Sequence, residues 1–330
     1  MRRTGAGAAA GWRDAVRAGD RRAIAKTITL LESTRPDHAA LAQEILEALL
    51  PDTGQAVRLG ITGSPGVGKS SFIETLGLHV LGQGRRVAVL AIDPSSPISG
   101  GSILGDKTRM ERLAQEKNAF IRPSPSGGAL GGVTQRTRET MLVCEAAGFD
   151  PVIVETVGVG QSEVAVASMV DCFLVLLQPG AGDTLQGIKK GVLELADVLV
   201  VNKADGEQKA LALRAARDYT RALALLRPTS AVWRPPVLPA SAHTGEGVAA
   251  VWEAALAHRA ALAASGELEA KRRSQARAWL WSLLDEGLRA AFREHPGVGA
   301  LLEPLERAVA EQRATPAAAA RELLAAFRRD

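Results

Sequence analysis

The residues with the clearest chemistry form a glycine-rich stretch between an apolar run and a helical pattern. The stretch contains Gly63, Ser64, Pro65, Gly66, Val67, Gly68, Lys69, Ser70 and Ser71. It matches the phosphate-binding pattern G-x-x-x-x-G-K-[ST], in the strand-to-helix context that the pattern requires. The glycines let the backbone aim several N–H groups at one anion, and the positive end of the following helix points the same way. Lys69 adds a positive charge for the β- and γ-phosphates and Ser70 a hydroxyl for Mg²⁺. We therefore predict a nucleoside triphosphate site.

A second group of polar residues indicates which base is bound. Asn202-Lys203-Ala204-Asp205 follows the apolar run Val198–Val201. The Asp205 carboxylate can accept both the N1–H and the 2-amino group of guanine, a donor pair that adenine lacks. The Lys203 stem can lie along the base plane, and Asn202 can brace the loop. A backbone N–H further on would reach the guanine O6, in the stretch formed by Ser241, Ala242 and His243. The sequence thus favours GTP and GDP over adenine nucleotides.

A third motif, Glu155-Thr156-Val157-Gly158, is expected under the γ-phosphate. Glu155 would hold Mg²⁺ through water. The Gly158 N–H would meet a γ-oxygen only when triphosphate is bound, which makes this segment a switch. Many G proteins place a water-orienting glutamine directly after this glycine, but here Val159 follows and Gln161 comes two residues later. We therefore expect slow intrinsic hydrolysis that a partner or a rearrangement completes.

Two further acids, Asp93 and Asp106, flank a long loop rich in glycine and serine. Such a loop between acids is typical of a mobile clamp for metal and phosphate. The predicted Mg²⁺ ligands are Ser70, Asp93, Asp106 and Glu155. Asp93 could instead form an Asx turn before Pro94, and Asp106 a helix N-cap. Another glycine-rich loop, from Gln178 to Lys190, is either a mobile element that reports the nucleotide state or a plain loop and helix start.

Short apolar runs that alternate with helical stretches must position these motifs. The runs are Val57–Thr62, Val87–Ile92, Ala119–Pro123, Pro151–Glu155, Cys172–Leu177, Val198–Val201 and Val237–Ala240. Strands alternating with helices predict βαβ units, and hence an α/β fold with a mostly parallel central sheet. In such sheets ligands bind beyond the carboxyl ends of the strands, which is where the polar motifs fall.

Helical patterns flank the predicted sheet on both sides and suggest three parts. We predict an N-terminal helical extension at 1–56, a GTPase domain at 57–264 and a C-terminal helical region at 265–330. The first part, with two or three amphipathic helices, is either structural cladding or an interaction surface. In the last part, Trp279 and Trp281 would lie nearly opposite each other on a helix. Our hypothesis is that this region is a dimerisation arm. The alternative is that it packs back on the nucleotide-binding domain.

Composition narrows the class of protein. The chain is 46% hydrophobic and 23% charged, as in soluble globular proteins, and its net charge of +4 and aromatic content of 4% give no indication of nucleic-acid binding. The two cysteines, Cys144 and Cys172, form no Cys-x-x-Cys pair and are expected as buried free thiols. No apolar run approaches the roughly 18 residues of a membrane span, and no apolar signal region follows Arg2 and Arg3. We expect a cytoplasmic protein with no membrane or nucleic-acid partner.

Four blocks of sequence together resemble a known family. They are Gly63–Ser70, Ala91-Ile92-Asp93-Pro94-Ser95-Ser96-Pro97, Gly100–Met110 and Glu155–Ser162. These blocks resemble the metallocentre-assembly branch of the SIMIBI-class (signal-recognition-particle, MinD, BioD) NTPases. Within this branch they are similar to the MeaB/ArgK group, the G-protein chaperones of adenosylcobalamin-dependent methylmalonyl-CoA mutase. The resemblance covers nearly the whole chain, including the helical ends.

The resemblance implies more than the residue chemistry does. It implies a GTPase that binds GTP or GDP with Mg²⁺, forms homodimers through its C-terminal helices, and couples GTP hydrolysis to cofactor loading and protection of the mutase. Lys69, Ser70, Asp93, Asp106 and Glu155 match the family's phosphate and Mg²⁺ positions; Asn202, Lys203 and Asp205 match its guanine site. The loop Gln178–Lys190 matches a third switch, with Asp183 and Lys189 as its working residues. The candidate catalytic residues are then Lys69, Asp93, Glu155, Gln161, Asp183 and Lys189.

Other functions stay open from the sequence. The older label of arginine/ornithine transport kinase in this group makes a phosphotransferase the main alternative, and a GTPase serving another cobalamin enzyme is a second. A kinase needs an acceptor pocket and a base beside the γ-phosphate, whereas the extra length here lies in switches and helices. Nickel-insertion GTPases share the branch but carry metal-capturing segments rich in His or Cys. The five histidines of this chain are scattered, which disfavours a metallochaperone.

Overall fold

The computed structural model describes residues 5–33, 35–92, 110–123, 130–156, 162–180, 190–225 and 229–328 of the 330-residue chain. The chain divides into two compact units, Met1–Gln275 and Ala276–Asp330. The predicted division into 1–56, 57–264 and 265–330 stays a prediction.

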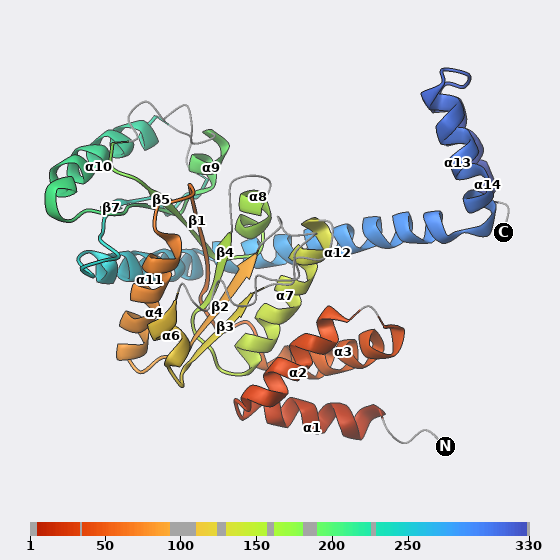
Figure 1. The fold of residues 1–330 in the computed structure, drawn as a ribbon. Helices are drawn as coiled ribbons and strands as arrows, with labels where there is room; N and C mark the ends of the chain where they lie inside the picture. The colour runs from red at the N-terminus through yellow and green to blue at the C-terminus, as the bar shows by residue number, and fades with distance from the viewer. Residues whose placement is uncertain are drawn as a thin grey trace. The chain divides into compact units, whose positions relative to one another are not determined.

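A parallel sheet of seven strands forms the centre of the first unit (Figure 1). The strands are β1 (Arg58–Gly63), β2 (Val87–Ile92), β3 (Ala119–Pro123), β4 (Val152–Thr156), β5 (Cys172–Leu177), β6 (Val198–Val201) and β7 (Val237–Pro239). Their order is β3-β2-β4-β1-β5-β6-β7, and each neighbouring pair is parallel. The predicted α/β fold with a mostly parallel sheet is confirmed.

The strand bounds follow the apolar runs closely. β2, β3, β5 and β6 begin and end where the sequence predicts, and the other three differ by one residue at one or both ends. β4 starts at Val152 rather than Pro151 because proline has no N–H to donate, although the Pro151 carbonyl still accepts the Ala88 N–H at 3.0 Å. β1 pairs with β4 on one side and β5 on the other. Its carboxyl end therefore lies in the middle of the row of strand ends, where α/β sheets bind ligands.

Helices cover both faces of the sheet (Figure 1). In chain order the helices of the first unit are α1 (Gly5–Arg17), α2 (Arg21–Glu32), α3 (Pro36–Leu49), α4 (Lys69–Gly82), α6 (Glu111–Gln115), α7 (Leu130–Ala146), α8 (Ser162–Ala167), α9 (Lys190–Leu195), α10 (Lys209–Leu223) and α11 (Val248–Ser265). Two 3₁₀ turns, Leu50–Asp52 and Gly206–Gln208, are part of the same unit, and α12 (Glu267–Glu294) begins in it. Asp20 caps the start of α2, since its carboxylate accepts the N–H groups of Arg22 and Ala23.

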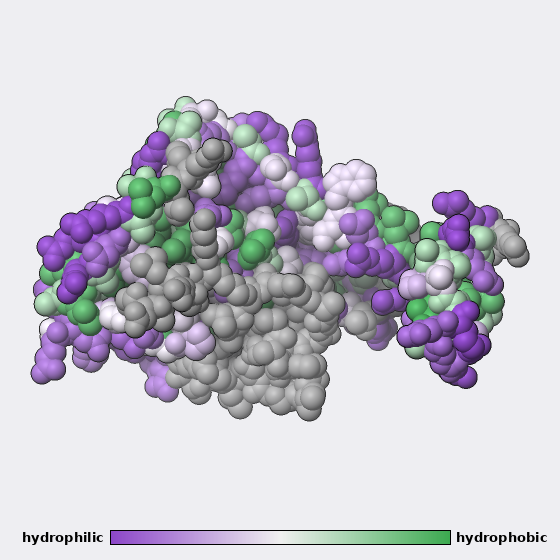
Figure 2. All heavy atoms as spheres, turned by 90° about the horizontal axis from the view of Figure 1, so that it is seen from above, coloured by the Kyte–Doolittle hydropathy of each residue, from purple (hydrophilic) through white to green (hydrophobic). Residues whose placement is uncertain are grey.

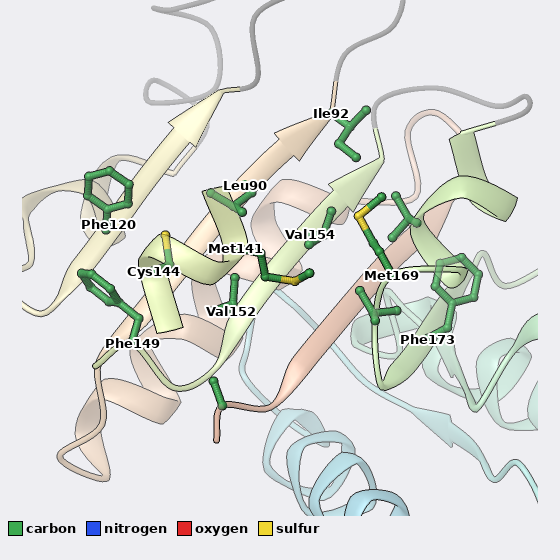
Figure 3. Packing of buried hydrophobic residues seen from close by; sticks show 14 of the residues in the cluster. Leu90, Ile92, Phe120, Met141, Cys144, Phe149, Val152, Val154, Met169 and Phe173 are labelled. Atoms are coloured by element: carbon green, nitrogen blue, oxygen red, sulfur yellow. The ribbon is translucent and has the colours of Figure 1, made fainter. Parts of the chain in front are cut away.

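Two hydrophobic cores result, one on each face. Helices α4, α6 and α11 pack on one face, with Phe72 and Trp252 fully buried there. On the other face, Leu90, Val152 and Val154 of the strands point towards Met141 and Cys144 of α7 (Figure 3). Strands that are buried on both faces consist of continuous apolar residues. The positions of these strands could therefore be predicted from the sequence.

The three N-terminal helices belong to the second of these cores. Ile24 and Ile28 of α2 and Ile45 of α3 are completely buried in the same cluster as the α7 and sheet residues. The sequence left open whether the N-terminal helices cover the sheet or form an interaction surface. The buried face of these helices packs on the sheet side of the molecule, which supports the first alternative.

Both cysteines are free and buried, as predicted. Cys144 lies in the core under α7 and Cys172 in the core on the opposite face. Burial raises the pKa of both thiols well above the ordinary value, so both stay protonated. Neither has the thiolate character that reactivity or metal binding requires.

Buried ion pairs hold the amino ends of the strands. The Asp171 side chain is completely buried and accepts two hydrogen bonds from the Arg272 guanidinium of α12, at 2.8 and 2.6 Å. It also accepts the Arg58 N–H at 3.0 Å. Burial alone would lower the pKa of Arg272, but the hydrogen bond and the charge of Asp171 outweigh it and raise this pKa. The start of α12 is therefore fixed to the sheet by a paired charge.

The second unit consists of the rest of α12 with α13 (Pro296–Ala310) and α14 (Pro316–Phe327). α12 and α13 are separated at His295, which caps α13 by accepting the Gly297 N–H on Nδ1 at 3.2 Å. Phe327 of α14 contacts the rings of Phe292 and His295, at centroid distances of 5.4 and 5.2 Å. Hydrophobic and hydrophilic residues are interspersed on the face of the molecule seen in Figure 2. Among the helices of the described residues, we find none with the length and apolarity needed to cross a membrane.

Replacing Arg272 by alanine should destabilise the protein strongly. The change leaves the Asp171 carboxylate buried without its cation, which costs roughly 3–5 kcal/mol of unfolding free energy. Arg273, the next residue, makes only an exposed pair with Glu269, so Arg273→Ala should cost less than about 1 kcal/mol. Urea unfolding followed by circular dichroism measures both variants. Equal midpoints for the two would contradict this account of the α12 anchor.

Candidate nucleotide-binding site

The glycine-rich stretch forms a tight turn between β1 and α4. Gly68 is the N-cap of α4 and has φ 91°, a left-handed conformation that side chains disfavour. A Cβ on Gly68 would also lie 2.9 Å from Asn202 Nδ2, and one on Gly63 would lie 2.6 Å from the Leu176 carbonyl oxygen. Glycine is thus required at both ends of the loop, and the N-terminus of α4 faces the space that the loop encloses.

Lys69 and Ser70 lie at the mouth of this loop. Lys69 Nζ donates to the carbonyl oxygens of Gly63 at 2.7 Å and Ser64 at 3.4 Å, so the ammonium lies over the loop. The Ser70 hydroxyl donates to Glu155 Oε1 at 3.2 Å, and Glu155, at the end of β4, is only 3% exposed. A hydroxyl and a carboxylate oxygen beside a phosphate site are the hard ligands that Mg²⁺ prefers. Two of the four predicted metal ligands are therefore neighbours.

Asn202, directly after β6, joins the phosphate loop to the predicted base loop. Its Nδ2 donates to the Val67 carbonyl at 2.8 Å, and its Oδ1 accepts the Ala242 N–H at 3.0 Å. The side chain is 1% exposed, so both hydrogen bonds are shielded from water and are costly to lose. The bracing role predicted for Asn202 has a direct structural basis.

The base loop itself is held in shape by hydrogen bonds between its two segments. Ser241 donates its hydroxyl to Asp205 Oδ2 and accepts the Thr244 N–H on the same oxygen at 3.0 Å. Thr75 of α4 donates to the Ala242 carbonyl at 2.7 Å. Lys203 has φ 61°, a left-handed conformation that is uncommon for a side chain. Strain of this kind is typical of functional turns, and it sets the direction of the lysine between Asn202 and Asp205.

One cavity of about 510 Å³ connects these parts. Seven of its lining residues were predicted from the sequence: Gly68, Ser71, Asn202, Lys203, Asp205, Ala242 and His243. Six were not: Glu74, Thr75, Leu78, Arg112, Thr244 and Gly245. Glu74, Thr75 and Leu78 belong to α4 and follow Gly68 and Ser71 at intervals of three or four residues, so they lie on the same face of the helix. Helical periodicity could therefore have predicted these three lining residues. Arg112, on α6, carries no such signal.

Six predicted site residues lie outside the described residues, and their roles stay predictions. They are Asp93, Asp106, Gly158, Gln161, Asp183 and Lys189. The strands that precede three of these segments, β2, β4 and β5, all end on the same edge of the sheet as β1. The connectivity is thus consistent with loops that start around the phosphate loop.

A second group of potential metal ligands lies at the opposite, amino end of the strands. Cys172, Asp197 and His258 place one ligand atom each within 4.8 Å of one another. Lys271 Nζ, however, is 3.4 Å from Asp197 Oδ2, and burial keeps the Cys172 thiol protonated through its raised pKa. Burial would raise the pKa of Asp197, but the His258 hydrogen bond and the Lys271 charge lower it overall. The group is best explained as an internal ion pair.

The geometry can now be compared with known proteins. A family described as "Methylmalonyl Co-A mutase-associated GTPase MeaB" matches residues 24–297. "GTPase ArgK" of Escherichia coli (strain K12) is 51% identical over 271 residues, which are 82% of each chain. "Methylmalonic aciduria type A homolog, mitochondrial" of Mus musculus is 46% identical over 320 residues, covering 94% of this chain and 77% of that one.

A solved structure is similar as well. It is entitled "Crystal structure of LAO/AO transport system kinase" and superposes with a TM-score of 0.77 at 39% sequence identity, covering 96% of both chains. Since the likeness extends over nearly the whole length, it includes the helical ends as well as the sheet and its loops.

Changing Asp205 to asparagine should move base preference from guanine towards xanthine. The amide can no longer accept from both N1–H and the 2-amino group, whereas its N–H can donate to the extra oxygen of xanthine. We expect the affinity for GDP to fall by roughly tenfold or more, at about 1–3 kcal/mol for the unpaired groups, and that for xanthosine diphosphate to rise. Calorimetry on the variant measures both.

The matched control for this change is Asp218→Asn, at an exposed position of α10, which should bind as the unchanged protein does. Tight GDP binding by Asp205→Asn would show that the specificity carboxylate is another residue.

Proposed function

The chain belongs to the MeaB family of methylmalonyl-CoA mutase-associated GTPases, and on this premise we propose that it is a GTPase chaperone of that mutase. It binds and hydrolyses GTP, gates the loading of adenosylcobalamin into methylmalonyl-CoA mutase, and protects the loaded enzyme from inactivation. We place this activity in the cytoplasm. The single observation that carries the proposal is the cavity that joins a phosphate loop to a guanine-type base loop, in a chain with this family assignment.

Each residue of the site has a role in this proposal. The backbone between Gly63 and Ser70 binds the phosphates, Lys69 neutralises their charge, and Asp205 selects guanine. Ser70 and Glu155 would hold Mg²⁺ together with Asp93 and Asp106. The ion supplies charge neutralisation on the β- and γ-phosphate oxygens. Asn202 keeps the base loop and the phosphate loop in fixed relation, so that one nucleotide contacts both.

The nucleotide state is communicated through the segments that follow the strand ends. Glu155, the last residue but one of β4, contacts Ser70, and Gly158 follows three residues later in the sequence. A contact from Gly158 to the γ-phosphate would pull on the chain between β4 and α8, and Asp183 and Lys189 would respond as part of the third switch. Such a segment has two states, with and without the last phosphate, which is what a partner enzyme can sense.

We further propose that the protein is a homodimer in which α12 takes part. Leu280, Trp281, Leu284 and Leu288 of α12 are 56%, 66%, 44% and 61% exposed. At 3.6 residues per turn these four side chains form one stripe along the helix. An exposed apolar stripe of this length is typical of a surface that another protein covers.

Binding to the mutase should depend on the nucleotide. With purified full-length chain and methylmalonyl-CoA mutase, we expect the dissociation constant to differ by roughly tenfold between GDP and a non-hydrolysable GTP analogue, within the usual range of allosteric coupling. The corresponding ATP analogue is the control and should have no effect. A second adenosylcobalamin enzyme, measured in parallel, tests which enzyme is served. Equal affinity for the mutase in all nucleotide states would exclude the switch.

Charges placed on the α12 stripe should dissociate the dimer. The variant Leu284→Glu with Leu288→Glu puts two carboxylates into the apolar contact, and light scattering should then show a monomer where the unchanged chain is a dimer. The control is Ser282→Glu, which adds a charge on the opposite side of the same helix. Dimers that persist in the double variant would place the interface elsewhere.

A further inference from the structure

One wall of the nucleotide cavity has no role in the function proposed so far. It is formed by Glu74 of α4 and Arg112 of α6. Glu74 Oε1 accepts the backbone N–H groups of Arg112 at 2.8 Å and Leu113 at 3.3 Å. Within the described residues, Glu74 Oε2 has no hydrogen bond and the Arg112 guanidinium no hydrogen bond or ion pair. A carboxylate oxygen and a cation that line a ligand cavity are thus both available.

The Glu74 carboxylate is held in place by α6. Leu113 is completely buried against α4, where a Cβ on Gly77 would lie 2.7 Å from Leu113 Cδ2. Met110, just before α6, is completely buried too. The two amide hydrogen bonds fix the Glu74 carboxylate. A rigid acceptor binds a ligand hydroxyl with little loss of side-chain entropy.

The position along α4 indicates which part of the nucleotide this wall meets. Ser70 is at the phosphate end, and Glu74 lies four residues, or about 6 Å, further along the helix axis. In a nucleotide, the α-phosphate separates the ribose from the β-phosphate by a comparable length. The base end of the cavity is occupied by Asp205 and Lys203. The sugar, which joins base and phosphates, is therefore the part left for the wall between them.

The chemistry of a carboxylate also indicates that Glu74 meets the ribose of the nucleotide. Phosphate oxygens are acceptors that carry negative charge, so a carboxylate cannot bind them. The hydrogen-bond donors of a guanine nucleotide are the base N–H groups and the two ribose hydroxyls, and Asp205 is assigned to the base. The ribose hydroxyls are the remaining donors, and a carboxylate is a strong acceptor for them.

We propose that Glu74 is the residue that recognises the ribose, by accepting a hydrogen bond from a ribose hydroxyl on Oε2. Arg112, which lines the same wall, supplies a positive charge that reduces the electrostatic repulsion between the Glu74 carboxylate and the phosphates of the nucleotide. The pair makes the site select ribonucleotides over deoxyribonucleotides. This inference rests on the proposed binding of guanine nucleotides in the cavity.

The test is calorimetry of the full chain with GDP, 2′-deoxy-GDP and 3′-deoxy-GDP. The unchanged protein should prefer GDP over at least one deoxy form by roughly tenfold, the difference that one hydrogen bond to a charged group makes. Glu74→Gln retains an oxygen for the α6 amides but removes the charge, so this ratio should fall to about threefold or less. Arg112→Ala should lower the affinity for all three nucleotides by the same factor, and so leave the ratio of the GDP affinity to the deoxy-GDP affinity unchanged.

The matched controls are Glu47→Gln on α3 and Arg217→Ala on α10, which are exposed and distant in sequence from the cavity residues. Both should bind all three nucleotides as the unchanged chain does. Glu74→Asp, which retains the charge, should keep part of the preference, and it replaces Glu74→Gln if circular dichroism shows that the glutamine variant is unfolded.

The outcomes separate this inference from the function on which it rests. A folded Glu74→Gln that binds GDP with an undiminished ratio, or an unchanged protein that binds GDP and both deoxy forms equally, would overturn the ribose assignment and leave the GTPase site intact. If the unchanged protein bound no guanine nucleotide, the proposed function itself would fail.

Discussion

The buried amide of Asn202 is the contact on which the rest of the site depends. One end of a single side chain binds the phosphate loop through the Val67 carbonyl, and the other end binds the base loop through the Ala242 N–H. Because the side chain is 1% exposed, water cannot replace either bond. Both loops follow parallel strands, and the strands alone would leave their relative positions to two independent turns. The Asn202 amide fixes the two loops relative to each other. A nucleotide that binds the phosphate loop with its phosphates and the base loop with its base needs this fixed spacing.

The two ends of the sheet are stabilised by different interactions. At the amino end, charges are paired and buried, as in the contacts of Asp171 with Arg272 and of Glu145 with Arg58. At the carboxyl end, Glu155 accepts the Ser70 hydroxyl and Asp205 accepts the Ser241 hydroxyl. A carboxylate has two oxygens with about four lone-pair sites, so accepting a hydroxyl leaves sites for a metal ion or a base. The buried ion pairs thus lie at the amino end of the strands, and the candidate nucleotide site lies at the carboxyl end.

Much of the fold and about half of the cavity wall could be predicted from the sequence, for identifiable reasons. Strands such as Val87–Ile92 are buried on both faces and are continuously apolar, so their bounds are visible without a structure. The phosphate and base motifs are local, because a turn dictates residue types at fixed spacing. Arg112 and Thr244 reach the cavity through tertiary packing, which leaves no local pattern. The roles of Asp183 and Lys189 are assigned by resemblance alone, whereas Asp93 was predicted from its place beside a glycine-rich loop as well.

The anchoring of α12 bears on how a nucleotide signal could leave the site. Gln275 donates to the Val170 carbonyl at 2.9 Å and Lys271 to the Asp171 carbonyl at 2.6 Å. Both acceptors belong to the short turn between α8 and β5, and α8 begins at Ser162, four residues after the motif Glu155–Gly158 ends in the sequence. A displacement of that motif is thus separated from the α12 anchor by a single helix of six residues. Since packed elements move as bodies rather than deforming, a shift of α8 would act on this turn, where the ion pair of Asp171 with Arg272 joins it to α12.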